Sequence, residues 1–354
     1  MGLPSVFPII HRRINVMAIP MPKSAVLPGL FVLLASAAQA EPDFTGKTIT
    51  IVSSFGAGGG YTTYADILAR HVGAHLPGKP DVIVRTMPGA GGLNGTQHLF
   101  NVAVRDGSVL GVVPQTVAIA QALGESALRY DAPAFNWIGR LNSNVEVQQV
   151  WHTAAVKTIE DARSKEAILG GTGPESSSVV FPRILNAMFG MKFKVVAGYE
   201  GVNMVSIAVE RGEVEGLVRP WSITKTVRPE WLREGKINLL VQYALVRHPE
   251  LPNVPAVVDL AQTAEQRQVL GLYASGSDIG RSIVAPPGVP ADTVAMLRRA
   301  FMAAMRDPGL LADVAKSGTD IDPLAGERLQ EIVRQAVAVP PRAVEQAKRF
   351  SANR

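Results

Sequence analysis

Three glycine-rich segments, 56–63, 88–92 and 170–178, constrain the fold of this chain most strongly. The first two follow short runs of β-branched and apolar residues, at 48–55 and 81–86. Such runs are typical of strands that are buried on both faces of a parallel sheet. Each glycine-rich segment then leads into a stretch with helical spacing of its apolar residues. Strands that alternate with helices predict βαβ units, so we expect an α/β fold.

This strand–loop–helix order occurs near the N-terminus and starts again close to residue 167. The first half contains expected strands at 48–55, 81–86 and 108–113 and expected helices at 64–76 and 93–102. The second half contains expected strands at 167–170, 192–197, 214–218 and 237–243, with helices ending near 189 and spanning 202–211. The last third is mainly helical, at 261–272, 291–305, 308–317 and 327–339. Two such halves predict two similar α/β domains around a cleft.

The composition agrees with a folded chain of about two domains. The chain has 354 residues, of which 47% are hydrophobic and 18% charged, and domains usually have about 100–200 residues. Cysteine is absent, which excludes disulfides, thiolate metal ligands and thiol catalysis. We expect no metal and no cofactor.

The first 40 residues have the features of a secretory signal. Lys23 precedes a 14-residue, mainly apolar run at 25–38, and Ala38-Gln39-Ala40 supplies the small-x-small pattern of a cleavage site. A membrane anchor needs about 18–20 apolar residues. We therefore expect residues 1–40 to be signal peptide and leader, with cleavage after Ala40 and a periplasmic mature protein. The leader is long from Met1, which leaves Met17 and Met21 as alternative translation starts.

The net charge of +5 belongs mainly to this leader. Arg12, Arg13 and Lys23 are its charged residues; subtracting these three from 35 basic residues leaves 32 against 30 acidic ones. The rest of the chain is nearly balanced and has no basic stripe with interleaved aromatic residues, so a nucleic-acid partner is not expected.

The glycine-rich segments favour anion binding. Each opens a helix, where free backbone N–H groups and the helix dipole attract negative charge, and glycine lets a ligand approach the backbone. The alternative is that they are only tight turns. No segment contains a strict G-x-G-x-x-G pattern or a G-x-x-x-x-G-K-[ST] pattern, so neither a dinucleotide nor a nucleoside triphosphate is favoured.

Catalytic motifs are also missing from the sequence. There is no G-x-S-x-G and no H-E-x-x-H. His71 and His75 have ligand spacing on one expected helix, but no third ligand is evident nearby. His98, His152 and His248 have no recognisable nucleophile or acid partner in the sequence, although a triad assembled in space would not show there. We therefore do not expect an enzyme.

Several segments in a fixed order resemble one protein family. They read TITIVSSFGAGGGYTTYADILARHV, VIVRTMPGAGGLNGTQHLFNVAVRDGSVLGVV, WIGRLNSNVEVQQVWHT and RSIVAPPGVPADTVAMLRRAF. In this order they resemble the receptor subunit of tripartite tricarboxylate transporters, the Bug-type extracytoplasmic solute-binding proteins. The resemblance spans about 44–340, nearly all of the expected mature chain.

The resemblance implies a two-domain periplasmic binding protein of type II-like architecture, with two βαβ domains around a ligand cleft and a two-segment hinge. Domain 1 would comprise 44–142 plus 278–354, and domain 2 would comprise 143–277. The two hinge segments would lie near 140–148 and 274–282. The ligand of such a receptor is typically a small carboxylate held partly by backbone amides and water.

The same resemblance implies a set of ligand-binding residues in the glycine-rich segments: Gly58, Gly59, Gly60, Tyr61, Thr62, Thr63, Gly91, Thr172, Gly173, Ser176, Ser177 and Ser178. Tyr199, Arg219 and Trp221 follow or end expected strands of domain 2 and are further candidates; an arginine can hold a carboxylate through two parallel hydrogen bonds. A surface ion pair of Arg219 and rim packing of Tyr199 remain alternatives. The family usually has Asp soon after the first glycine run, where this chain has Tyr61-Thr62-Thr63, which favours an anionic ligand.

These observations predict an exported receptor, a monomer, that captures a small di- or tricarboxylate-like organic anion and delivers it to integral membrane permease subunits. Two other classes stay open: a periplasmic sensor module for a signalling partner, and an exported hydrolase or lyase. Turnover of the bound ligand would distinguish the enzyme, and neighbouring genes for membrane subunits would distinguish transport from sensing.

The first testable prediction concerns export. The exported protein should begin at Glu41, because Ala38-Gln39-Ala40 has the small residues that signal peptidase requires. N-terminal sequencing or intact-mass spectrometry of the periplasmic fraction checks this. Exported protein that still carries Lys23 would contradict cleavage and favour a membrane anchor.

Overall fold

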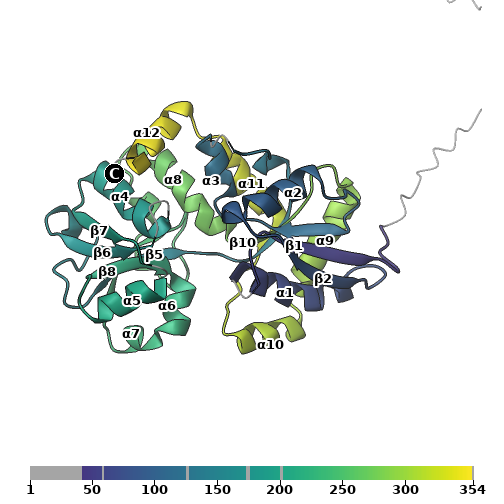
Figure 1. Ribbon diagram of the computed structural model, residues 1–354, viewed down its shortest axis with the longest axis horizontal. Coiled ribbons are helices and arrows are strands. Elements are labelled where there is room, and N and C mark those ends of the chain that lie inside the picture. Colours follow the sequence, from purple (N-terminus) through teal and green to yellow (C-terminus); the bar gives the residue numbers. More distant parts are fainter. Residues whose placement is uncertain (1–41, 58–59, 125–126, 173–175, 200–201, 353–354) are drawn as a thin grey trace, which may run out of the picture. The chain divides into compact units, whose positions relative to one another are not determined.

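The computed structural model describes residues 42–352, except 58–59, 125–126, 173–175 and 200–201. The expected signal peptide therefore lies outside the described residues. The strands of the described part form two β-sheets, each with helices packed against it (Figure 1). The strands are β1 (Thr48–Ser53), β2 (Asp81–Thr86), β3 (Val109–Val112), β4 (Asn136–Asn142), β5 (Glu146–Trp151), β6 (Ala167–Gly171), β7 (Phe193–Ala197), β8 (Gly216–Pro220), β9 (Ile237–Tyr243), β10 (Arg281–Ala285) and β11 (Leu324–Ala325).

The longer helices alternate with these strands over much of the chain. They are α1 (Gly60–Val72), α2 (Leu93–Asn101), α3 (Val117–Ala122), α4 (Ser177–Phe189), α5 (Val202–Glu210), α6 (Trp221–Val227), α7 (Pro229–Arg233), α8 (Ala264–Ile279), α9 (Ala291–Ala304), α10 (Pro308–Ser317), α11 (Gly326–Val337) and α12 (Pro341–Ala352). No helix among the described residues has the length and apolar character needed to span a membrane.

The first sheet has the strand order β11-β4-β10-β3-β1-β2. Strand β1 pairs in parallel with β2 and β3, as the sequence predicts for βαβ units. Strand β10, from much later in the chain, enters between β3 and β4 and is antiparallel to both. The sheet is therefore mixed: β10 and β11, which come from the later part of the chain, run in the opposite direction to the other strands.

The second sheet follows the same plan, with the order β7-β6-β8-β5-β9. Strand β6 is parallel to β7 and β8, whereas β5 is antiparallel to β8 and β9. The expected α/β architecture is thus confirmed. The sequence predicted a parallel sheet, and strands β10 and β5, each antiparallel to both of its neighbours, correct that part of the prediction.

Two crossing segments connect the sheets. The chain passes from β4 to β5 through Ser143, Asn144 and Val145, and it returns from α8 directly into β10. The Asn144 backbone N–H donates to the Ser277 carbonyl at 2.9 Å, so the two segments run against each other. The expected hinge ranges, 140–148 and 274–282, contain these crossings; the division into two domains at these boundaries stays a prediction.

Burial explains why these segments form strands. Ile49 and Ile51 of β1 are fully buried in a cluster with Ile67 and Leu68 of α1 and with Phe301 of α9. In the second sheet, Leu169 belongs to a separate cluster with residues of α4, β9 and α8. Helix α12, which the sequence did not indicate, packs on α4 and α8 (Figure 1). The two clusters thus form where helices cover a face of each sheet, and polar loops follow the carboxyl ends of the parallel strands.

Candidate functional site

Arg281 is the central cationic group of the candidate site. It begins β10, at the point where the chain returns to the first sheet. Its guanidinium lies 4.3 Å from the centroid of the Tyr61 ring, a cation–π contact. Arg281 also donates from Nη2 to Asn144 Oδ1 at 3.1 Å and from Nη1 to Gln115 Oε1 at 3.4 Å. The arginine is therefore held by residues of α1, of the loop after β3 and of the first crossing segment.

Gln115 connects the groups around this arginine. Its Oε1 accepts from Asn144 Nδ2 at 2.6 Å, and its backbone N–H donates to the Tyr61 hydroxyl at 3.1 Å. Tyr61 is further held by stacking on Phe55, with ring centroids 4.0 Å apart. Burial raises the pKa of Tyr61 above its usual value, so this side chain is neutral. The first turn of α1, the loop after β3 and the first crossing segment thus share one hydrogen-bond network.

Glu146 is the acidic group of the same centre. It begins β5 and is only 6% exposed. Burial raises the pKa of Glu146 to about 6, against the lowering effects of a hydrogen bond with Ser177 and of the positive charge of Arg281. Ser177 is the first residue of α4, and Gly60, the first residue of α1, lies against the Arg281 guanidinium. The N-terminal ends of two helices, one packed on each sheet, therefore reach the Arg281–Glu146 pair.

Three buried polar atoms around this pair have no hydrogen-bond partner within the described part of the chain. They are Glu146 Oε2, Arg281 Nε and Gln148 Nε2. Buried polar groups are nearly always hydrogen-bonded, so such atoms need water or a ligand as a partner. These atoms mark a polar binding centre that offers both a positively charged N–H donor, on Arg281, and an acceptor oxygen, on Glu146.

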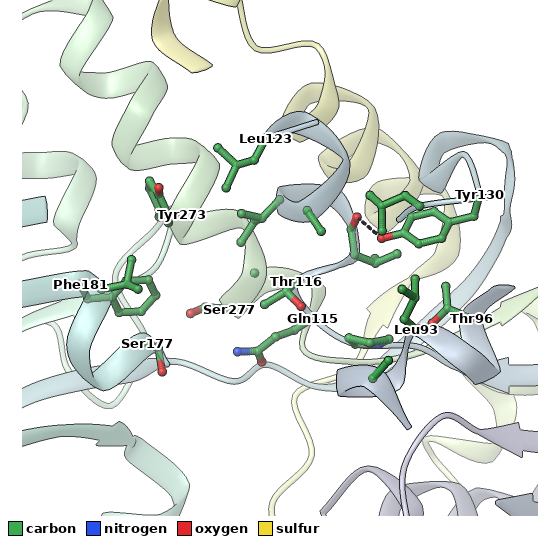
Figure 2. A pocket seen from close by; sticks show the side chains of 18 residues that line it. Leu93, Thr96, Gln115, Thr116, Leu123, Tyr130, Ser177, Phe181, Tyr273 and Ser277 are labelled. Carbon is green, nitrogen blue, oxygen red and sulfur yellow. Dashed lines mark hydrogen bonds between the residues drawn. The ribbon is translucent and has the colours of Figure 1, made fainter. Parts of the chain in front are cut away.

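A cavity of about 440 Å³ lies next to this centre (Figure 2). Gln115, which contacts Arg281, and Ser177, which contacts Glu146, both line it. The other lining residues come from the start of α2, the loop after β3, α3, α4 and α8: Ala90, Leu93, Thr96, Pro114, Thr116, Val117, Ile119, Ala120, Leu123, Leu128, Tyr130, Val180, Phe181, Tyr273, Gly276 and Ser277. The volume is in the range of small-molecule pockets.

The structure brings together Gly60, Tyr61 and Ser177 of the residues expected from the sequence. Thr62 and Ser178 instead stabilise their own loops: the Thr62 hydroxyl donates to the Gly56 carbonyl at 2.8 Å, and Ser178 Oγ accepts from the Thr172 N–H at 3.1 Å.

The remaining loop residues take several positions. Ser176 Oγ lies 2.8 Å from Ser178 Oγ. Thr63 is in the first turn of α1, and Gly91 is in the short 3₁₀ helix Ala90–Gly92 at the cavity. Gly58, Gly59 and Gly173 lie outside the described residues. The ligand-binding role of all these residues stays a prediction.

The three further candidates lie apart from this cavity. Arg219 is fully buried, donates to Ser206 Oγ and to the Ile223 carbonyl, both at 3.0 Å, and stacks over Trp231. Burial lowers the pKa of Arg219 to about 10. Tyr199 packs against the apolar cluster of α5.

Trp221 lines a second cavity and donates from Nε1 to Glu250 at 2.6 Å. That cavity also contains Lys225, which pairs with Glu250 at 2.9 Å and with Asp320 at 2.7 Å. Its charges are therefore already paired within the protein.

His71 of α1 and His75 of the 3₁₀ helix Gly73–His75 that follows it both have acidic partners. His71 Nε2 lies 2.9 Å from Asp313 Oδ2, and His75 Nε2 lies 3.0 Å from Asp307 Oδ2. Both aspartates belong to the α10 region, so the histidines hold α10 against α1. Among the described residues, no group of three or more potential metal ligands is present.

The sequence reasoning missed Arg281, Gln115, Asn144 and Glu146. A signal was available for one of them, since Arg281 is a charged residue shortly before the apolar stretch at 283–285. Gln115 and Asn144 carried no comparable signal, because their role depends on contacts between segments far apart in the chain.

Residues 68–340 match the family model described as the tripartite tricarboxylate transporter family receptor, TctC. The match covers most of the chain, and the chain belongs to this family. The family consists of transport receptors, so the protein is a Bug-type solute-binding receptor rather than an enzyme. No sequence among the curated proteins matches the chain.

Solved structures show the same fold. A TctC solute-binding protein from Polaromonas superposes with a TM-score of 0.66 at 18% identity, covering 86% of this chain and 97% of that chain. The periplasmic binding protein BugD gives a TM-score of 0.55 at 20% identity, with coverages of 86% and 97%. MatC from Rhodopseudomonas palustris, solved with bound malate, gives 0.55 at 20% identity, with coverages of 84% and 98%. The periplasmic binding protein fold is thereby confirmed.

The raised pKa of Glu146 predicts a pH-dependent stability. Because its folded pKa, about 6, exceeds the ordinary value of 4.5, protonation favours the folded state. This contribution to the free energy of unfolding is fully present below about pH 4.5, and it is lost as the pH rises through about 6. Glu146→Gln removes the ionisable group and with it this pH dependence. Between pH 4.5 and 7, the free energy of unfolding of the variant should therefore rise relative to that of the parent by up to about 2 kcal/mol.

Urea unfolding of both proteins across this pH range measures the effect. Glu213→Gln, at an exposed position, controls for the loss of one negative charge. A free-energy difference between Glu146→Gln and the parent that does not change with pH would contradict the buried environment of Glu146.

Proposed function

We propose that this protein is a periplasmic receptor that binds a small organic carboxylate beside Arg281 and delivers it to integral membrane permease subunits. The observation that carries this proposal is the buried Arg281 Nε, which has no hydrogen-bond partner among the described residues and lies next to a cavity and to the start of α1. A guanidinium N–H forms strong, charge-assisted hydrogen bonds with carboxylates. The dipoles of α1 and α4 add to the positive potential of the site.

The family supports both parts of the proposal. Its description, a receptor of tripartite tricarboxylate transporters, supports the permease as partner. The malate in MatC supports a carboxylate as ligand. The periplasmic fold of BugD supports export, together with the signal sequence at residues 1–40.

The proposed mode of action is closure of two domains around the ligand. The groups at the site come from both sides: Tyr61 from α1 and Gln115 from the loop after β3, both at the first sheet, and Ser177 from α4 at the second. A ligand that contacts both sides has a higher affinity for the closed form, and this difference is what shifts the equilibrium. The permease then recognises the closed, loaded receptor.

Binding should depend on Arg281. Arg281→Gln removes the cationic donor and should weaken carboxylate binding about 10- to 100-fold, as expected for the loss of a charge-assisted hydrogen bond of about 1.5–3 kcal/mol. Isothermal titration with malate, adipate and octanoate measures this. Arg247→Gln, which removes a cation from the exposed pair with Asp259, should leave binding unchanged.

Arg281→Lys should bind more tightly than Arg281→Gln, because the charge is retained although the planar group is lost. Full affinity in Arg281→Gln would move the site elsewhere. If no carboxylate binds the parent protein, the proposed function itself is wrong.

Ligand binding should protect both sides of the cleft together. Hydrogen-exchange mass spectrometry with a bound carboxylate should show slower exchange in 56–63 and in 171–178, since these segments open α1 and α4. Helix α9, which contributes no residue to the cavity lining and packs on β4, should hardly change. Protection of only one of the two segments would show that the ligand contacts one side only, and would contradict closure.

A further inference from the structure

The cavity beside Arg281 has polar groups at one end only. Gln115, Ser177 and Ser277 lie on the same side in Figure 2, with the Gln115 amide nitrogen turned toward the two serines. This is the side that contacts Arg281 and Glu146. The polar end of the cavity is therefore also its charged end.

The opposite side is apolar. Leu123 and Tyr273 lie on the side away from Gln115, and Phe181 lies between Tyr273 and Ser177 (Figure 2). Ile119 and Val180 also line the cavity.

The hydroxyl groups in this wall have partners within the protein. The Tyr273 hydroxyl donates to the Ala347 carbonyl at 3.3 Å, the Tyr130 hydroxyl to the Val117 carbonyl at 3.0 Å, and the Thr96 hydroxyl to the Gly92 carbonyl at 2.8 Å. The aromatic rings thus present apolar surface to the cavity.

None of the described residues that line the cavity is Asp, Glu, His, Lys or Arg. A charged group buried without a partner is strongly unfavourable, whereas an apolar group gains free energy there. A dicarboxylate that fills this cavity would place its second carboxylate against leucine and aromatic rings of the lining. Lys348, whose Nζ lies 3.6 Å from the position that a Gly124 Cβ would take, is outside that lining.

We propose that the ligand is a carboxylate with a single charged end and an apolar hydrocarbon or aromatic body. The carboxylate lies at the Gln115–Ser177 end, within reach of Arg281, and the body fills the space between Leu123, Phe181 and Tyr273. This inference rests on the proposed receptor function and narrows its substrate class: the cavity selects against the di- and tricarboxylates that the sequence led us to expect.

Matched pairs of acids test this inference. Octanoate and octanedioate have the same chain length and differ only in the second carboxylate, as do 4-methylbenzoate and benzene-1,4-dicarboxylate. In titration calorimetry with the full exported protein, at least one single-ended acid should bind about ten-fold more tightly than its two-ended partner, or better; this ratio corresponds to about 1.4 kcal/mol. Equal binding, or tighter binding of the diacids, overturns the inference.

A charge introduced at the apolar end should reverse the preference. Leu123→Lys places a cation there and should raise the affinity for octanedioate relative to octanoate by about ten-fold. Val246→Lys, at a position 69% exposed and outside the cavity lining, should leave the ratio unchanged. An unchanged ratio in a folded Leu123→Lys protein, checked by circular dichroism, would place the acid's body elsewhere and overturn the inference.

The outcomes also separate this inference from the proposed function. If the diacids bind as tightly as their partners and binding still depends on Arg281, the receptor function stands and only the single-ended ligand is wrong. If neither member of either pair binds, nor malate or adipate, both are wrong.

Discussion

The partly buried guanidinium of Arg281 sets the arrangement of the candidate site. Removing such a group from water is costly, and the protein compensates with the Tyr61 ring, the Asn144 and Gln115 side-chain oxygens and the nearby charge of Glu146. These partners come from separate segments that are brought together only when the second crossing enters the first sheet as β10. The antiparallel insertion of β10 between β3 and β4 is therefore also what assembles the site.

The glycine-rich segments act through their position more than through their side chains. Thr62, Thr172 and Ser178 make their hydrogen bonds within their own loops, and so fix the starts of α1 and α4. Tyr61 stands where the family usually has an acid, and its ring supports the Arg281 guanidinium. The site nevertheless contains a carboxyl group, which comes from Glu146 at the start of β5 and not from the first loop.

The sequence predicted the parts of the fold that depend on local patterns. Apolar runs such as 48–55 gave the parallel strands, and helical spacing gave α1, α9 and α10. It did not predict β4, β5 and β10, since strands with Arg140, Gln148 or Arg281 lack a clear hydrophobic period and form through pairing with distant segments. For the candidate site, too, the sequence predicted only what depends on local patterns, namely the glycine-rich loops that open helices. It did not predict Arg281, Gln115, Asn144 and Glu146, because their roles depend on tertiary contacts.

The opposite charges of Arg281 and Glu146 have a consequence for the kinetics of binding. The negative charge of Glu146 opposes the positive potential of Arg281 and of the two helix N-termini, which weakens the long-range attraction of the site for an approaching anion. The association rate is then set by diffusion and by the opening of the cleft, and it depends weakly on ionic strength. Short-range contacts made after entry govern the residence time, which makes the receptor selective through slow release rather than through fast capture.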